Sequence, residues 1–169
     1  TDSSFLGFSS SRITISTSGI PKFIKKLADD RIKTRLAISL HSAREEIRKK
    51  IMPFTKKIPL ETLKESLVYW QNRNKKILTL EYIVFDSIND LKEDIYALIE
   101  FCKGLRVKLN LIEYNPIENG IFKQANNKAI ELYKKELIKY KITVTIRKSR
   151  GKDIDAACGQ LANKNELVF

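Results

Sequence analysis

The chain has 169 residues, of which 43% are hydrophobic and 31% are charged, and its formal net charge is +12. Such a chain is long enough for one domain with a buried core. Its positive charge favours a polyanionic partner, most simply nucleic acid, unless it only reflects a lysine-rich proteome.

Membrane proteins and disulfide scaffolds are disfavoured by the same sequence. No apolar run approaches the roughly 18 residues that a membrane span requires. The two cysteines, Cys102 and Cys158, are not spaced like metal ligands and are too few for a disulfide framework, which favours the cytoplasm. The N-terminal residues resemble neither a signal peptide nor a transit peptide and contain no initiator methionine. We therefore expect the chain to begin within a longer protein.

Five apolar segments rich in β-branched residues are expected to form strands, with helical segments between them. The expected strands are residues 12–16, 35–40, 77–85, 107–114 and 142–146, and the expected helices are residues 22–31, 60–71, 91–103 and 128–140. Alternation of this kind predicts a parallel sheet with right-handed crossovers. The result is either a doubly wound sheet or part of a (β/α) barrel.

The helix boundaries carry recognisable signals. Pro21 and Pro59 are expected at the first helical position of their helices. Asn89 or Asp90, and Asn126 or Asn127, are expected to cap the third and fourth helices, and Gly104 to end the third. On the third helix, the inward face is expected to consist of Leu91, Ile95, Leu98, Ile99 and Cys102, which makes Cys102 a core residue.

Polar residues recur where the expected strands end. They lie at residues 16–19 (STSG), 39–42 (SLHS), 86–90 (DSIND) and 115–116 (NP). The carboxyl ends of barrel strands share one face, which carries the ligand site, so this recurrence favours a barrel over a doubly wound sheet. No glycine-rich phosphate-binding turn of the usual nucleotide folds follows any strand.

Each of these strand-end motifs has a structural alternative. The STSG segment either lets a backbone approach a ligand closely or caps the next helix through Thr17 or Ser18. His41, the single histidine, is either structural or functional, and no cluster around it indicates zinc. Asn115 either orients a ligand or ends a strand before Pro116.

Cys158 follows a cluster of basic residues near the C-terminus, which consists of Arg147, Lys148, Arg150 and Lys152. Positive neighbours lower a thiol pKa and favour a nucleophilic thiolate, whereas Asp153 and Asp155 oppose it. The residues alone leave Cys158 open as nucleophile or structural residue. They leave the basic cluster open as a phosphate-contacting loop or a solvated tail.

Six segments taken together resemble a known family. In chain order they are RITISTSGIP, LAISLHS, RKKIMPFTKK, EYIVFDSIND, LNLIEYNP and RKSRGKDIDAACGQL. They resemble the RlmN family of bacterial radical S-adenosylmethionine methyltransferases, which methylate carbon-2 of adenine in 23S rRNA and in tRNA. The resemblance runs from residue 7 to residue 162, and the last segment is the most specific.

The resemblance implies a role for each matching residue. Cys158 matches the cysteine that carries the methyl group, and the contacts to S-adenosylmethionine are matched by Ser16, Ser39, Leu40, His41 and Asn115. The loop of residues 147–162, with Arg147, Lys148, Arg150 and Lys152, is expected to contact RNA. The implied enzyme is a cytoplasmic monomer that uses a [4Fe–4S] cluster and an electron donor.

The departures from the family pattern matter as well. Family members bind the cluster through three cysteines in a C-x-x-x-C-x-x-C motif, which this chain lacks. The Gly-Glu motif, the second catalytic cysteine and the N-terminal accessory domain of the family are also absent. We therefore expect residues 1–169 to be the C-terminal part of a radical S-adenosylmethionine barrel, with only its later strands and helices, and to be inactive alone.

Three other functions compete with this one. The related adenine carbon-8 methyltransferases also carry a C-terminal cysteine, although the final segment is more similar to the carbon-2 family. A non-catalytic basic RNA-binding module would use the same cations without Cys158. A barrel enzyme acting on phosphosugars is disfavoured because no phosphate loop is present.

Overall fold

Five parallel strands form one sheet in which each strand lies beside the strand that precedes it in the chain. The structure is a computed structural model and describes residues 10–116 and 120–147. The strands are β1 (Thr14–Thr17), β2 (Arg35–Ser39), β3 (Leu78–Ile83), β4 (Val107–Ile112) and β5 (Thr143–Arg147). The order β1-β2-β3-β4-β5 never reverses, so the described sheet has no switch point. This confirms the expected parallel sheet and favours the barrel over the doubly wound alternative.

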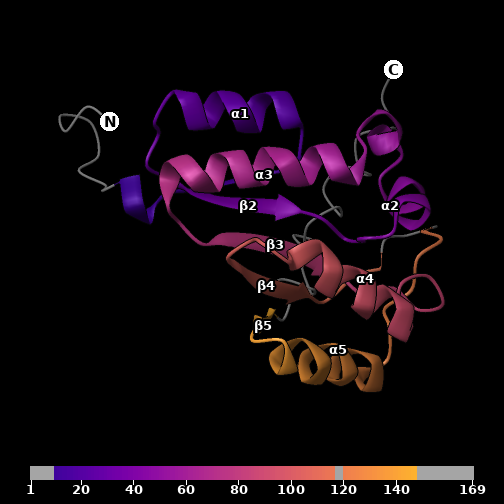
Figure 1. Ribbon diagram of the computed structural model, residues 1–169. Coiled ribbons are helices and arrows are strands. Elements are labelled where there is room, and N and C mark those ends of the chain that lie inside the picture. The colour runs from indigo at the N-terminus through magenta and orange to yellow at the C-terminus, as the bar shows by residue number, and fades with distance from the viewer. Residues whose placement is uncertain (1–9, 117–119, 148–169) are drawn as a thin grey trace.

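Helices cover one face of this sheet and the carboxyl ends of its strands. They are α1 (Pro21–Asp29), α2 (Glu45–Ile51), α3 (Leu60–Asn74), α4 (Lys92–Cys102) and α5 (Asn127–Lys139), with 3-10 helices η1 (Ser10–Arg12) and η2 (Pro53–Lys57). Crossovers of one hand between successive neighbouring strands place α1, α3, α4 and α5 on the same side. Figure 1 shows these four wrapping around the outside of the strands, from α1 and α3 through α4 to α5. Helix α2 instead lies beyond the carboxyl end of β2 (Figure 1), where Arg48 contacts the loop after β1.

The outer face of the sheet is apolar and packs under these helices. Along β2, Leu36 and Ile38 are fully buried, and in register with them lie Leu80 of β3 and Leu109 of β4. Helix α3 covers them with Leu63, Leu67 and Trp70, each fully buried. Removal of these large side chains from water supplies the main free energy that holds the sheet and helices together.

The inner face of the sheet is polar, which is unusual for parallel strands. The register aligns Ser39, Glu81, Asn110 and Thr145 in one row across β2 to β5. All four are partly or fully exposed. Parallel sheets are usually apolar on both faces because both are covered. A polar, uncovered inner face therefore marks the side on which a ligand can bind.

Most expected boundaries are confirmed within a few residues, and the exceptions are informative. Pro21 does begin α1, and the Asn126 side chain caps α5 by accepting a hydrogen bond from the Ala129 N–H at 2.9 Å. Pro59 instead precedes α3, which begins at Leu60. Neither Asn89 nor Asp90 caps α4; its N-cap residue is Leu91, which is exposed rather than inward-facing.

Helix α2 and the 3-10 helix η2 were not expected from the sequence. They fill the long connection between β2 and α3. Within the described part of the chain, no helix has the length and apolar character needed to cross a membrane.

Candidate functional site

The side chains singled out at strand ends do gather at one edge of the sheet, because parallel strands end on the same side. Ser16 of β1 and Ser39 of β2 both lie on the inner face, in register positions that differ by one row. Ser16 Oγ donates a hydrogen bond to Glu81 Oε2 of β3 at 3.1 Å, across the intervening strand β2. A side chain of β1 thus meets one of β3, and Glu81 joins the candidate site as a carboxylate that the sequence had not indicated.

The STSG segment forms a tight loop rather than a helix cap. Thr17 Oγ1 accepts a hydrogen bond from the Gly19 N–H at 3.2 Å, while Ile20 occupies the N-cap position of α1 without a side-chain bond. Gly19 has φ +92°, and a Cβ there would lie 3.1 Å from Leu63. The glycine is therefore required both by backbone conformation and by space.

Arg48 is a buried cation beside this loop. It lies on α2, has 1% of its surface exposed, and donates from Nη2 to the Ser18 carbonyl at 3.0 Å. Its Nε and Nη1 have no hydrogen-bond partner among the described residues. Buried polar groups are almost always paired, so unmatched donors on a buried guanidinium indicate a place for an anionic or polar ligand group. The sequence did not indicate Arg48, because it is the one buried residue of α2 and a charged residue in a lysine- and arginine-rich segment predicts an exposed side chain.

His41 is held in a fixed orientation at the end of β2. Its backbone has φ +56°, and its Nδ1 accepts a hydrogen bond from the Ile83 N–H at 3.2 Å. Burial first, and the nearby Arg48 charge second, lower the pKa of His41 to about 4. The imidazole is therefore neutral at physiological pH, with the proton on Nε2 because Nδ1 is the acceptor. It can donate a hydrogen bond to a ligand but cannot act as a cation.

Leu40 contributes to this edge through its backbone. Its side chain is fully buried in the core, and its N–H donates to the Glu81 carbonyl at 3.0 Å. Its carbonyl accepts from the Ser42 N–H at 2.7 Å. Leu40 can therefore offer a ligand only the second lone pair of that carbonyl, and neither its N–H nor its side chain.

Asn89 joins the ends of β2 and β3. Its Nδ2 donates to the carbonyls of His41 at 2.7 Å and Ile83 at 2.9 Å, and its Oδ1 accepts from the Phe85 N–H. Tyr133 of α5 donates to the Asn89 carbonyl at 2.6 Å. This fully buried amide fixes the two strand ends relative to each other. The sequence pattern had instead predicted that Asn89 caps a helix.

Asn115 lies in the loop that follows β4 and is 7% exposed. The neighbouring ring of Tyr114 contacts Phe85 edge-on at a centroid distance of 5.0 Å, and Phe85 also contacts Phe122 at 4.8 Å. These aromatic rings anchor the loop against the end of β3, so Asn115 is held at the same edge as Ser16, Ser39 and His41.

Arg147 ends β5 at this edge and is exposed; register places it beside Ile112. The other residues expected to act here, Lys148, Arg150, Lys152 and Cys158, lie outside the described residues. Within residues 10–116 and 120–147, no group of three or more histidine, cysteine or carboxylate side chains could hold a metal ion. Cys102, as expected, is buried in the core, and burial raises the pKa of its thiol to about 12.

Several known proteins are similar to this chain. A protein of Christiangramia forsetii named probable dual-specificity RNA methyltransferase RlmN is 59% identical over 160 residues, which cover 95% of this chain and 46% of that protein. A protein of the same name from Flavobacterium psychrophilum is 58% identical, over 97% of this chain and 47% of its own length. The chain thus spans about half the length of the curated relatives it matches. No protein-family profile matches it.

Two solved structures share the fold of this chain. A radical SAM methyltransferase from Sphaerobacter thermophilus matches with a TM-score of 0.86 and 33% identity, over 90% of this chain and 45% of that chain. A domain of a pyruvate-formate lyase-activating enzyme from Bacteroides vulgatus shares the fold with a TM-score of 0.61 at 14% identity, over 79% of this chain and 80% of that one. The expected α/β part-barrel is confirmed.

Proposed function

We propose that this chain is the C-terminal part of a radical S-adenosylmethionine methyltransferase of the RlmN type, which methylates carbon-2 of adenine in 23S rRNA and tRNA. The observation that carries the proposal is the polar inner face, with Ser16, Ser39 and Glu81 meeting at the carboxyl ends of parallel strands. The identity of 56 to 59% with proteins named RlmN supports it.

The described residues fit S-adenosylmethionine. Gly19 allows a close backbone approach, and neutral His41 offers an Nε2–H donor. Ser16, Ser39 and Asn115 add polar groups, and the unmatched donors of Arg48 supply positive charge beside the loop that follows β1. We propose that these residues hold the adenosyl and methionyl parts of the molecule. When bound, it supplies the methyl group and the radical chemistry that an electron-poor carbon requires.

A [4Fe–4S] cluster does not fit the chain. Its ligation in this superfamily requires three cysteine thiolates, and the chain has two cysteines, of which Cys102 is buried. We therefore propose that the cluster ligands belong to another part of the full protein and that residues 1–169 alone do not methylate. Anaerobic reconstitution of these residues with iron and sulfide should give no stoichiometric cluster by absorbance.

Cys158 is proposed as the residue that carries the methyl group as a thioether before its transfer to RNA. Thiolate character would come from the neighbouring cations Arg147, Lys148, Arg150 and Lys152, which would also contact the RNA backbone. Since base chemistry requires an accessible ring, the target adenine should be unpaired or extruded. We propose a cytoplasmic monomer that receives electrons from a separate donor.

The test is methylation by the full-length protein. The unsubstituted enzyme, reduced and supplied with S-adenosylmethionine, should add methyl groups to an unmodified tRNA transcript, and mass spectrometry of the nucleosides should show 2-methyladenosine. Cys158→Ala should abolish turnover while tRNA affinity stays within twofold, whereas Cys102→Ala should retain turnover. An 8-methyladenosine product would favour the carbon-8 enzymes. Unchanged function of Cys158→Ala in cells would favour a non-catalytic RNA-binding module.

A further inference from the structure

The amino ends of the strands, opposite the candidate site, carry a second cluster of positive charge. The turns that lead into β2, β3 and β5 each contain a basic residue with positive φ: Arg31 at 52°, Lys75 at 55° and Lys141 at 60°. Further cations occupy these turns and the turn that leads into β4. We define the basic rim as Arg31, Lys33, Lys75, Lys76, Arg106 and Lys141. Among the described residues, none of these six forms an ion pair.

Hydrogen bonds fix the turns of the rim relative to one another. The Gln71 side chain donates to the carbonyls of Lys76 and Arg106, each at 2.8 Å, and accepts from the Arg106 N–H at 2.8 Å. Lys76 Nζ donates to the Lys33 carbonyl and so links the next turn. Because Gln71 is 6% exposed and its side chain makes three bonds, the rim is preorganised rather than a set of independent side chains.

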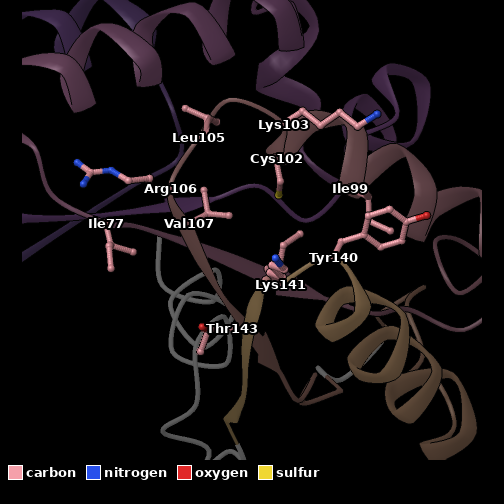
Figure 2. Close-up of a pocket in the computed structure, with 11 residues that line it drawn as sticks. Ile77, Ile99, Cys102, Lys103, Leu105, Arg106, Val107, Tyr140, Lys141 and Thr143 are labelled. Carbon is pink, nitrogen blue, oxygen red and sulfur yellow. The ribbon is translucent and has the colours of Figure 1, made fainter.

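A hollow of about 500 Å³ opens beside Arg106 and Lys141. Figure 2 shows Arg106 and Ile77 on one side of the hollow and Tyr140 on the other, with Lys141 and Cys102 between them. Ile77 is 57% exposed and Tyr140 is 52% exposed, and aliphatic side chains form much of the wall. The thiol of Cys102 has a raised pKa and is protonated, so it contributes apolar surface and not a nucleophile.

Helix stabilisation explains only part of this arrangement. Cations just beyond a helix carboxyl end interact favourably with its dipole, and this accounts for Arg31, Lys75 and Lys141. It does not account for Lys33 or Arg106, which come later in their turns, two residues before β2 and one residue before β4. It also gives no reason for the exposed Ile77 and Tyr140 beside them. Cations next to an exposed aromatic ring over an apolar hollow are the features that bind unpaired nucleotides.

We propose that the basic rim and its hollow form a second docking surface, for a single-stranded segment of the RNA. The phosphates lie on Lys76, Arg106 and Lys141, and one unpaired base packs against Tyr140 and the aliphatic wall. This inference rests on the proposed RNA substrate. The rim is at the opposite end of the strands from Ser39 and His41, so it contacts RNA remote from the reacting adenine and adds affinity without entering the site.

The test compares two double variants of the full-length protein on an unmodified tRNA transcript. Arg106→Gln/Lys141→Gln removes two rim charges. Lys22→Gln/Lys25→Gln removes two exposed charges of α1 that form no ion pair in the described part of the chain. Fluorescence anisotropy at a series of salt concentrations gives log Kd against log salt for each. The rim variant should bind more weakly, with a slope shallower by roughly 0.7 to 0.9 per lost phosphate contact, while the α1 variant keeps the original slope.

Variants of Tyr140 test whether an unpaired base of the RNA packs against its ring. Tyr140→Leu should lower affinity by about tenfold, and Tyr140→Phe should retain it, because stacking needs the ring and not the hydroxyl. With 4-thiouridine in the transcript, ultraviolet crosslinks should map to the peptide that contains Tyr140. Circular dichroism spectra identical to those of the unsubstituted protein exclude misfolding as the cause.

The outcomes separate this inference from the proposed function. If the unsubstituted protein binds and methylates the transcript while the rim variant keeps its affinity and salt slope, the rim is not a docking surface and the proposed function stands. An equal loss of RNA affinity in the rim and α1 variants would also contradict the rim as a docking surface, since the loss would then reflect the overall charge of the protein. If the unsubstituted protein binds no RNA, both proposals fail.

Discussion

At the scale of single residues, His41 links the candidate site to the stability of the fold. The unfolded histidine has a pKa near 6.5, whereas burial and the Arg48 charge lower the folded value to about 4. As the pH falls from 6.5 to 4, His41 therefore binds a proton in the unfolded chain but not in the folded chain. The contribution of neutral His41 to the free energy of unfolding is fully present above pH 6.5 and is lost as the pH falls from 6.5 to 4. Its upper limit is about 3 kcal/mol, because one pKa unit corresponds to about 1.4 kcal/mol.

His41→Gln should remove this pH dependence. The glutamine Oε1 can replace Nδ1 as acceptor for the Ile83 N–H but does not titrate in this range. Urea unfolding from pH 7.5 to 4.5 should show that the unfolding free energy of the unsubstituted protein falls relative to that of the variant as the pH falls. Arg48→Met should move the His41 pKa, measured by NMR, part of the way back toward 6.5. A parallel pH response of both proteins would contradict the assignment.

Gly19 provides a second prediction at this scale, with Gly104 as its matched control. Both glycines have positive φ, +92° and +80°, but a Cβ at Gly104 meets nothing within 4 Å, whereas at Gly19 it would press on Leu63 and Arg48. Gly104→Ala should cost about 1 kcal/mol of unfolding free energy from backbone strain alone. Gly19→Ala should cost at least twice as much in chemical denaturation and should also weaken binding of S-adenosylmethionine by the full-length protein. Equal costs would show that the loop has room for a side chain.

At the scale of elements, Asn89 holds the ends of β2 and β3 together. Asn89→Ala would leave the buried carbonyls of His41 and Ile83 and the buried N–H of Phe85 without their partner. We expect a loss of about 3 kcal/mol in unfolding free energy, since each orphaned buried group costs about 1 to 3 kcal/mol. Asn72→Ala, on the exposed side of α3, should change stability by less than about 0.5 kcal/mol. Thermal unfolding of both variants measures the difference.

The same residue shows where local sequence patterns fail. An asparagine shortly before a helical pattern predicts a cap, and this prediction is confirmed at Asn126. At Asn89 the side chain instead satisfies backbone groups of two strands that are distant in sequence. Helix α2 was missed for a related reason. Its buried inward residue is Arg48, so its apolar period is too weak to indicate a helix.

At the scale of the whole molecule, the sequence predicted the architecture better than the site. Strand–helix alternation and polar strand ends were enough for the parallel sheet, its barrel-like order and the shared edge of Ser16, Ser39, His41 and Asn115. These features follow from local periodicity and from the geometry of parallel strands. Glu81 and Arg48 could not be predicted, because their importance comes from register and burial. Those depend on contacts such as the one between Ser16 and Glu81, across 65 positions of sequence.

The sequential strand order also bears on how the chain is made. Each strand pairs with the one synthesised just before it, so a nascent chain can add one strand and its helix to a growing sheet without waiting for distant segments. In a sheet whose strand order reverses, an edge strand stays unpaired until a later strand is synthesised, which slows folding and exposes that edge to aggregation. Vectorial folding on the ribosome would therefore proceed from β1 toward β5. The Asn89 side chain could join β2 to β3 early, and the bond from Tyr133 to the Asn89 carbonyl would form last, once α5 is synthesised.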